Sequence, residues 1–221
     1  MGAETPKQFL ELDGVPIVIL SLRRIAACPL ISEIIVATRA ENVEPLNARI
    51  SQEKFKQPVR VVKGADSRQG SVAAALKLVS DDTELVVVHD AVRPFVTVEQ
   101  VTRVIEQARR HKAAILGIPA MDTVKEVKRA SLPEDVAVIT ATVPRERVVL
   151  AQTPQVFETQ LLKQAFAEAE GGLNASDEAG LVERLGLNVF VVQGSERNIK
   201  ITKPSDMDLA RFYLHSEQKT A

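Results

Sequence analysis

The strongest constraint on the fold is a regular alternation of short β-branched runs with longer amphipathic stretches. The runs carry apolar residues on both faces, as strands buried in a parallel sheet do. The stretches between them space apolar residues three and four apart, as helices do. This alternation predicts an α/β fold with a mostly parallel sheet and helices on both faces. The predicted strands are 33–38, 59–63, 85–89, 113–118 and 189–193, and the predicted helices are 67–79, 97–111, 158–169 and 204–214.

Two helix starts carry capping signals. Thr97 is the expected N-cap of the helix over 97–111. In the last predicted helix, Ser205 and Asp208 form a pattern that resembles a capping box. With 221 residues, the chain is long enough for one sizeable α/β domain, which we expect to span residues 1–221.

One segment breaks the alternation. Residues 123–128 and 136–143 are two β-rich runs around a proline-containing turn at 132–134. They predict a hairpin arm, at about 121–150, inserted into the α/β domain. An exposed hairpin is marginally stable alone, so we expect the arm to pack on another subunit. The alternative, that it folds back on its own domain, stays open.

Composition excludes several classes of function. Lys and Arg total 28 and Asp and Glu total 29, and a net charge of −1 gives no global electrostatic attraction to nucleic acid. The single cysteine, Cys28, allows no disulfide within the chain, which fits a reducing compartment. The apolar run at 15–20 is too short to span a bilayer, which needs about 20 residues. We therefore expect a cytoplasmic protein with no nucleic-acid or membrane partner.

A small polar loop, residues 64–71, follows the predicted strand at 59–63. Ligands of α/β sheets bind beyond the carboxyl ends of the strands. The backbone N–H groups of this loop and the side chains of Asp66 and Ser71 can hold an anion or read the edge of a base. The alternative is an ordinary loop with a capping serine.

Four further candidate residues lie near the end of a predicted strand, before the last predicted helix or near the N-terminus. Asp90 and Arg93 follow the strand at 85–89, and offer an acceptor for hydroxyls or metal and a fork for phosphate. Lys200, just before the last helix, can neutralise phosphate as a point charge, and Lys7 is a similar candidate. The alternatives are a local ion pair and solvated surface lysines. The three histidines have no metal-ligand spacing, so we assign no protein metal ligand.

These clusters, in this order, are far more specific together than any one of them. The chain resembles the 2-C-methyl-D-erythritol 4-phosphate cytidylyltransferases over nearly its whole length. The resemblance implies a Rossmann-like fold of the nucleotide-diphospho-sugar transferase type. The motifs that carry it are TPKQFLELDG at 5–14, GADSRQGSV at 64–72, VVVHDAVRPF at 86–95, DTVKEV at 122–127, TVPRERV at 142–148, AQTPQVF at 151–157, SDEA at 176–179 and GSERNIKITKPSDM at 194–207.

The resemblance implies transfer of a cytidylyl group from CTP to 2-C-methyl-D-erythritol 4-phosphate, with release of pyrophosphate. The substrate phosphate would attack the α-phosphorus of CTP directly. Fixed cations and N–H donors would then supply most of the catalysis. Mg²⁺ would be held mainly by the CTP phosphates, with few protein ligands.

The family's functional residues map onto positions of this sequence. By resemblance, Lys7 stabilises the transition state, Lys200 and Arg145 position the attacking phosphate, and the arm forms a homodimer in which it completes the partner's site. The implied catalytic residues are Lys7, Arg145 and Lys200. The implied nucleotide-binding residues are Gly64, Ala65, Asp66, Ser71, Asp90 and Ala91. The implied residues binding the methylerythritol phosphate are Asp90, Arg93, Thr123, Arg145, Thr153 and Lys200.

One feature of the family has no counterpart in this sequence. The family carries an apolar strand, a glycine-rich loop and an arginine just before a Met-Gly pair, and this sequence starts at Met1 and Gly2. Without an interior strand, we expect unpaired strand edges and uncovered apolar helix faces. Three interpretations follow: an active cytidylyltransferase with a start upstream of Met1, an inactive relative that acts as a binding subunit, or a cytidylyltransferase for another polyol phosphate such as ribitol 5-phosphate.

Overall fold

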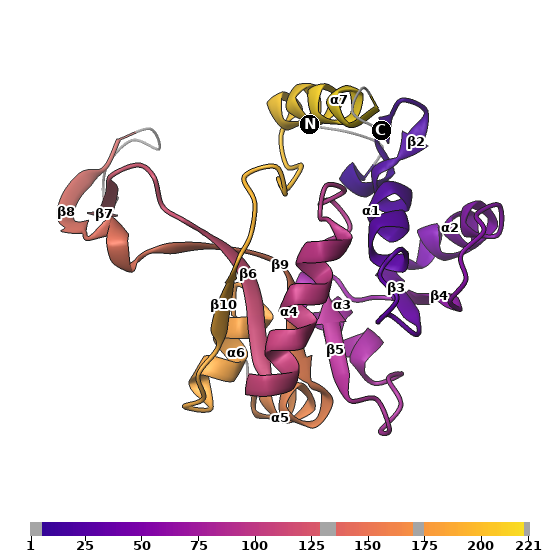
Figure 1. Ribbon diagram of the computed structural model, residues 1–221, viewed down its shortest axis with the longest axis horizontal. Helices are drawn as coiled ribbons and strands as arrows, with labels where there is room; N and C mark the ends of the chain where they lie inside the picture. The colour runs from indigo at the N-terminus through magenta and orange to yellow at the C-terminus, as the bar shows by residue number, and fades with distance from the viewer. Residues whose placement is uncertain (1–5, 129–135, 170–174, 219–221) are drawn as a thin grey trace.

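The computed structural model describes residues 6–128, 136–169 and 175–218, and its centre is a four-stranded sheet (Figure 1). The strand order is β10-β6-β9-β5. The strands are β5 (Leu85–Val88), β6 (Ala113–Pro119), β9 (Val149–Glu158) and β10 (Phe190–Gln193). Because β10 pairs parallel with β6, and both β5 and β6 pair antiparallel with β9, three strands run in one direction and β9 runs against them. The predicted strands at 85–89, 113–118 and 189–193 are confirmed to within about one residue.

Strand β9 was not predicted from its sequence, VLAQTPQVFE. A proline within a run argues against a central strand, because it cannot donate to the ladder. The structure accommodates Pro154 through an irregularity: Ile115 pairs with Gln155, but the next residue, Leu116, pairs with Gln152. The two residues skipped on β9 include the proline, so the ladder continues on either side of it.

Helices cover both faces of this sheet, as predicted. Helix α4 (Val98–His111) packs on one face, and helices α5 (Thr159–Ala169) and α6 (Glu178–Arg184) pack on the other. The neighbouring residues Val156 and Phe157 of β9 are fully buried in the two different clusters. A strand between two helix layers must be apolar on both faces, which is the pattern of the sequence.

The capping prediction is confirmed for one helix and wrong for another. Thr97 caps α4 with a complete capping box that includes Gln100. Helix α7 (Pro204–Gln218) begins differently: Asp206 accepts hydrogen bonds from the backbone N–H groups of Thr202 and Lys203. The carboxylate of Asp208 instead binds Arg211 on the exposed face of the helix.

The first part of the chain forms a second group of elements beside the central sheet (Figure 1). It contains a short 3₁₀ helix η1, a two-stranded hairpin, helices α1 and α2, and the parallel pair β3–β4, followed by α3. Helices α1 and α2 were not predicted. The apolar residues of α1 are buried on more than one side, in three separate clusters, so a single apolar stripe is not evident in its sequence. The bounds are η1 (Lys7–Phe9), β1 (Glu11–Leu12), β2 (Val15–Pro16), α1 (Ile17–Ala26), β3 (Ile34–Thr38), η2 (Ala40–Asn42), α2 (Val43–Ile50), β4 (Val59–Lys63) and α3 (Arg68–Leu76).

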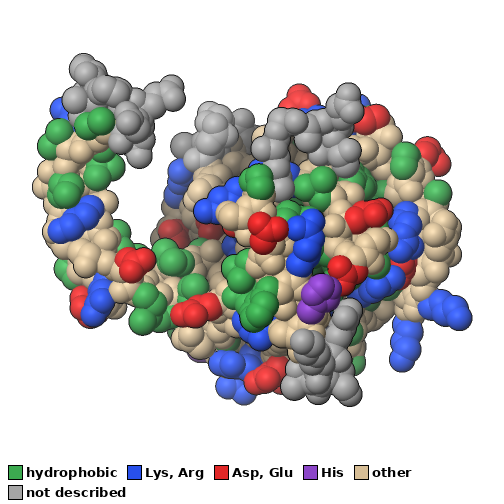
Figure 2. All heavy atoms as spheres, turned by 90° about the horizontal axis from the view of Figure 1, so that it is seen from above, with side chains coloured by type: hydrophobic (Ala, Val, Ile, Leu, Met, Phe, Trp, Pro, Cys, Tyr) green, Lys and Arg blue, Asp and Glu red, His purple; other side chains and the backbone are tan. Residues whose placement is uncertain are grey.

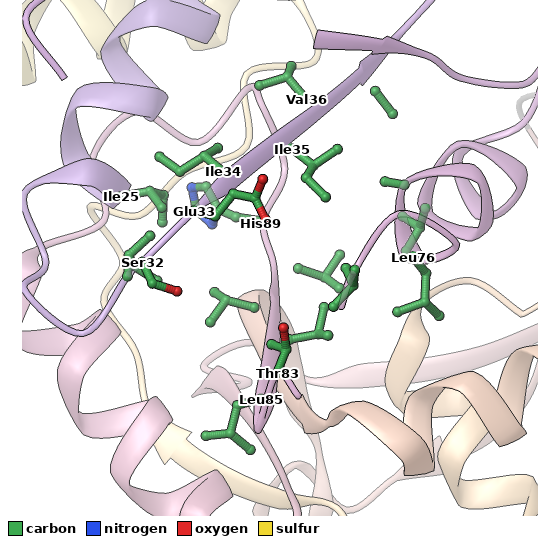
Figure 3. A pocket seen from close by; sticks show the side chains of 18 of the residues that line it. Ile25, Ser32, Glu33, Ile34, Ile35, Val36, Leu76, Thr83, Leu85 and His89 are labelled. Carbon is green, nitrogen blue, oxygen red and sulfur yellow. The ribbon is translucent and has the colours of Figure 1, made fainter. Parts of the chain in front are cut away.

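A cavity of about 650 Å³ separates β3 from β5 (Figure 3). Aliphatic side chains form much of its wall, among them Ile34 and Ile35 of β3, Leu76 of α3 and Leu85 of β5. Among the described residues, β3 pairs only with β4, and β5 pairs only with β9. The unpaired strand edges expected from the sequence are therefore present, and they face this cavity.

The predicted hairpin is present as an arm that stands away from the body (Figure 1). Strand β7 (Val124–Lys128) pairs antiparallel with β8 (Val138–Val143), and the 3₁₀ helix η3 (Arg145–Arg147) leads into β9. The predicted turn at 132–134 lies outside the described residues. The arm does not fold back on its own domain, and Figure 2 shows hydrophobic side chains exposed along it.

Candidate active site

The site centres on Asp90, which lies two residues after the end of β5. Three cations from three different segments reach its carboxylate: Lys200 Nζ at 3.0 Å, Arg68 Nε at 3.0 Å and Arg93 Nε at 3.4 Å. Arg68 is the first residue of α3, and it follows the loop at the carboxyl end of β4. The carboxyl ends of β4 and β5 therefore meet at one edge, where α/β folds bind ligands.

The charges around Asp90 determine its protonation. Burial opposes ionisation of this carboxyl, but the positive charges of Arg68 and Lys200 outweigh it and lower the pKa of Asp90 to about 2. Asp90 is therefore an anion at neutral pH. It holds the two arginines and Lys200 in fixed positions, with Lys200 still 40% exposed to solvent.

The segment that carries Lys200 is fixed by buried hydrogen bonds. Arg93 Nη1 donates to the carbonyl of Asn198 at 2.7 Å, and the fully buried Asn198 side chain donates to the carbonyl of Thr153 at 2.9 Å. The backbone N–H of Ile201 donates to the carbonyl of Val92 at 3.0 Å. These contacts place Lys200 before any ligand arrives, which is what electrostatic catalysis requires.

A hydrogen-bond chain behind Asp90 involves His89 and Thr153. His89 Nε2 lies 3.0 Å from the carbonyl of Arg93, which can only accept, so Nε2 carries the proton. Burial lowers the pKa of His89 to about 4, so its Nδ1 is an acceptor at neutral pH and the hydroxyl of Thr153, 3.0 Å away, donates to it. The same hydroxyl accepts from the backbone N–H of Asp90 at 3.0 Å.

These hydrogen bonds give Thr153 a role in positioning its neighbours. Its side chain is buried, only 4% of the residue is exposed, and its hydroxyl is already engaged as donor and acceptor. The geometry assigns it to the placement of His89 and Asp90. Its expected contact with the methylerythritol group stays a prediction.

The loop 64–71 closes on the hydroxyl of Ser71. Ser71 Oγ accepts from the N–H of Ala65 at 3.0 Å. Its single hydroxyl proton can be donated to the carbonyl of Ser67, 2.9 Å away, or to that of Ala65, 3.1 Å away. Gly64 packs so tightly that a Cβ there would lie 2.6 Å from Ser71 Oγ. The segment 64–71 is thus one folded unit: residues 64–67 form the loop proper, Ser67 is the N-cap of α3, and residues 68–71 are the first turn of that helix.

The other predicted residues lie around this centre or away from it. Ala91 is held by its carbonyl, which accepts from Ser21 Oγ at 2.8 Å, and Asp66 is exposed in the loop. Lys7 is exposed in η1, and no hydrogen bond or ion pair joins it to Asp90 within the described part of the chain. Thr123 and Arg145 lie in the arm, outside the cluster; Arg145 Nη1 donates to the carbonyl of Met121 at 2.8 Å.

Arg68 and Glu178 were not predicted as site residues. The two Nη atoms of Arg68 donate to the two oxygens of Glu178, at 2.8 Å and 2.9 Å. The side chain of Glu178 is 1% exposed. Both residues stand within motifs of the resemblance, RQGSV and SDEA, but 110 residues separate them, so no local pattern indicates the pair.

Residues 6–128, 136–169 and 175–218 contain no group of three or more His, Cys, Asp or Glu that could hold a metal ion. Asp90 is the one carboxylate at the centre of the cluster, and cations already occupy it. No helix within the same residues is long and apolar enough to cross a membrane.

Fold and site together define an α/β protein with an anion-binding site, in which a cationic cluster and a folded loop lie at the carboxyl edge of the sheet. A sequence model of the family described as IspD, 2-C-methyl-D-erythritol 4-phosphate cytidylyltransferase, matches residues 1–216. The chain belongs to this family.

Relatives and solved structures agree with the family. Cytidylyltransferases of that name from Acidobacterium capsulatum and Solibacter usitatus are 52% and 50% identical to the chain; the alignments cover 95% and 96% of this chain and 87% and 86% of the relatives. The 4-diphosphocytidyl-2C-methyl-D-erythritol synthase of Anaerococcus prevotii superposes with a TM-score of 0.83 at 29% identity, over 93% of this chain and 88% of that one. The Thermus thermophilus cytidylyltransferase gives a TM-score of 0.76 at 36% identity, over 94% and 93%.

Proposed function

We propose that this chain transfers a cytidylyl group from CTP to 2-C-methyl-D-erythritol 4-phosphate, producing 4-diphosphocytidyl-2-C-methyl-D-erythritol and pyrophosphate. The observation that carries the proposal is the set of three cations fixed on Asp90 beside the folded loop. Membership of the family supplies the identity of the two substrates.

The cluster suits a reaction between two phosphates. Arg68, Arg93 and Lys200 carry three positive charges against the two negative charges of Asp90 and Glu178, which leaves one net positive charge. Arg93 and Arg68 are held by several partners, whereas Lys200 has Asp90 as its ion-pair partner and is the most exposed of the three. We therefore assign contact with the reacting phosphates to Lys200.

In the reaction, a phosphate oxygen of the second substrate attacks the α-phosphorus of CTP. The new P–O bond forms while the bond to the leaving pyrophosphate breaks, and negative charge is redistributed over the phosphoryl oxygens. Lys200, already placed, stabilises this charge without rearrangement. The loop 64–71, with Asp66 at its exposed surface, is assigned to the nucleotide. Mg²⁺ enters as part of the nucleotide substrate, and no dedicated protein cage is assigned to it.

The arm is assigned to a homodimer. Val138 and Ile139 are 57% and 58% exposed, and Met121 at the base of the arm is 68% exposed. An apolar hairpin in this state gains stability from a partner surface. In a symmetric dimer, each arm would bring Thr123 and Arg145 to the other subunit's cluster. Both substrates are charged phosphates that need a carrier to cross a membrane, so we place the activity in the cytoplasm.

Release of pyrophosphate tests the proposed function. The purified protein is incubated with Mg²⁺, CTP and 2-C-methyl-D-erythritol 4-phosphate, and we expect release only with both substrates. Ribitol 5-phosphate in place of the methylerythritol phosphate, and ATP or UTP in place of CTP, are the matched controls, each expected at least about tenfold slower. Faster release with ribitol 5-phosphate would assign the other polyol. No release with either, together with no CTP binding, would favour the inactive binding subunit.

A further inference from the structure

The geometry points to Arg68 and Glu178 as a positioning pair that holds the loop 64–71 in its nucleotide-binding conformation. The identity of the nucleotide, CTP, rests on the proposed function. The placement of the loop by the pair rests on the structure alone. Neither residue is assigned a contact with the reacting atoms.

Arg68 and Glu178 form a bidentate ion pair in which the carboxylate is buried. Both oxygens of Glu178 are bound by one guanidinium, at 2.8 Å and 2.9 Å. Burial raises the pKa of Glu178, and the arginine opposes that shift. A buried carboxylate that loses its cation destabilises the folded protein. The side chain of Arg68 is therefore held in the one conformation that pairs with Glu178. That conformation fixes the start of α3 and hence the end of the loop.

Glu178 is itself anchored to the central strand β9. It is the first residue of α6, whose N-cap is Asp177. The almost fully buried Gln155 of β9 donates to Asp177 Oδ2 at 2.8 Å and accepts from the N–H of Ala179 at 3.0 Å. The start of α6 therefore cannot shift relative to the sheet without the loss of these bonds.

Arg68 extends this anchor to the loop and to Asp90. Its Nε donates to Asp90 Oδ1 at 3.0 Å, while its two Nη atoms hold Glu178. The side chain of Arg68 thus joins the loop to both the end of β5 and the start of α6. A second contact at the same junction, from the N–H of Ala175 to Gln69 Oε1 at 3.2 Å, strengthens the attachment.

Hydrogen exchange without nucleotide tests the placement directly. The amides of Gly64, Ala65, Gly70 and Ser71 are hydrogen-bonded, so their exchange reports on the loop. We expect these amides to exchange about tenfold faster in Glu178→Gln and in Arg68→Lys, which keeps the charge but loses the fork.

The chain offers a matched control in the pair of Arg23 and Glu53. This pair is also bidentate, with Nε and Nη2 of Arg23 donating to the two oxygens of Glu53 at 2.8 Å and 2.9 Å, and it joins α1 to the turn after α2. Glu53→Gln is expected to leave exchange of the loop amides unchanged. Unchanged exchange in Arg68→Lys, or an equal increase in Glu53→Gln, would overturn the inference. Arg68→Lys decides the outcome if Glu178→Gln does not fold.

Kinetics then separate this inference from the proposed function. If the wild-type protein turns over CTP, both variants should raise KM for CTP about tenfold and lower kcat by less than about threefold, because the reacting groups remain. Equal KM values in variants and wild type would overturn the positioning role. If the wild-type protein releases no pyrophosphate, the proposed function fails, and the exchange result still decides whether the pair holds the loop.

Discussion

Lys200 Nζ lies 3.0 Å from Asp90 Oδ2, so a residue near the C-terminal helix is joined to the end of β5 in the middle of the chain. The carboxylate is the fixed point of this relationship, since Arg68 and Arg93 hold it from other sides. Of the three cations that contact Asp90, Lys200 is the most exposed to solvent. In the proposed reaction, Lys200 is therefore the group that we expect to contact a substrate phosphate.

Removal of the Lys200 charge tests this role. In Lys200→Ala, we expect kcat/KM for pyrophosphate release to fall about 100-fold or more, the loss typical of one missing electrostatic donor. The exposed Lys203→Ala, three residues further on, is the matched control and should change kcat/KM by less than twofold. A change within twofold for Lys200→Ala would show that its assigned role is wrong.

The shared site across a dimer is tested by mixing two inactive variants, Lys7→Ala and Arg145→Ala. If each arm completes the partner's site, a heterodimer has one site with both residues intact. An equal mixture that has exchanged subunits should recover about a quarter of the wild-type sites, since about half of the dimers are mixed and each has one intact site. No recovery in proven heterodimers would contradict the shared site.

The tight packing of Gly64 predicts a specific loss on substitution. The Cβ of Gly64→Ala would meet Ser71 Oγ at 2.6 Å and displace the hydroxyl that closes the loop. We expect binding of CTP, measured by calorimetry, to weaken about tenfold or more. Gly180→Ala in α6 is the control, because its Cβ would meet only ordinary contacts at 3.4 Å and beyond. Equal affinities in both variants would show that the loop does not contact the nucleotide.

His89 predicts how stability depends on pH. Its pKa is about 4 in the folded protein and about 6.5 when unfolded, so the unfolded chain binds more protons between these values. The free energy of unfolding should therefore fall as pH drops from about 6.5 toward 4. A full shift of this size corresponds to about 3 kcal/mol, and the effect should be smaller because the ring borders the open cavity (Figure 3).

Urea unfolding at pH 7, 6 and 5 measures this effect. His89→Gln should remove most of the slope, whereas His215→Gln, on an exposed residue bound to Asp13, should keep it. Asp90 affects stability at lower pH than His89. Its lowered pKa contributes to the free energy of unfolding, and this contribution is lost as pH falls from about 3.8 toward 2. An unchanged slope in His89→Gln would contradict the assignment of a buried neutral imidazole.

Sequence patterns predicted most of the strands of the fold and some of the residues of the site. The strand at 59–63 was predicted with its observed bounds, and Thr97 caps α4 as expected. Asp90, Arg93 and Lys200 were named from sequence and do come together. Strand β9 was missed because Pro154 and its polar neighbours do not alternate, and only the irregular pairing with β6 shows how the strand continues.

The sequence by itself determined the α/β class, five of the strands, the inserted hairpin and the family, because these follow from local periodicity and from motifs along the chain. The tertiary structure decided which charges share a partner. Glu178 is paired with Arg68, 110 residues away, and the hydroxyl of Thr153 is turned to His89. The physical reason is that a buried polar group is stable only when it is hydrogen-bonded or ion-paired. Its partner is set by which segments the fold brings together, and separation along the chain does not predict this.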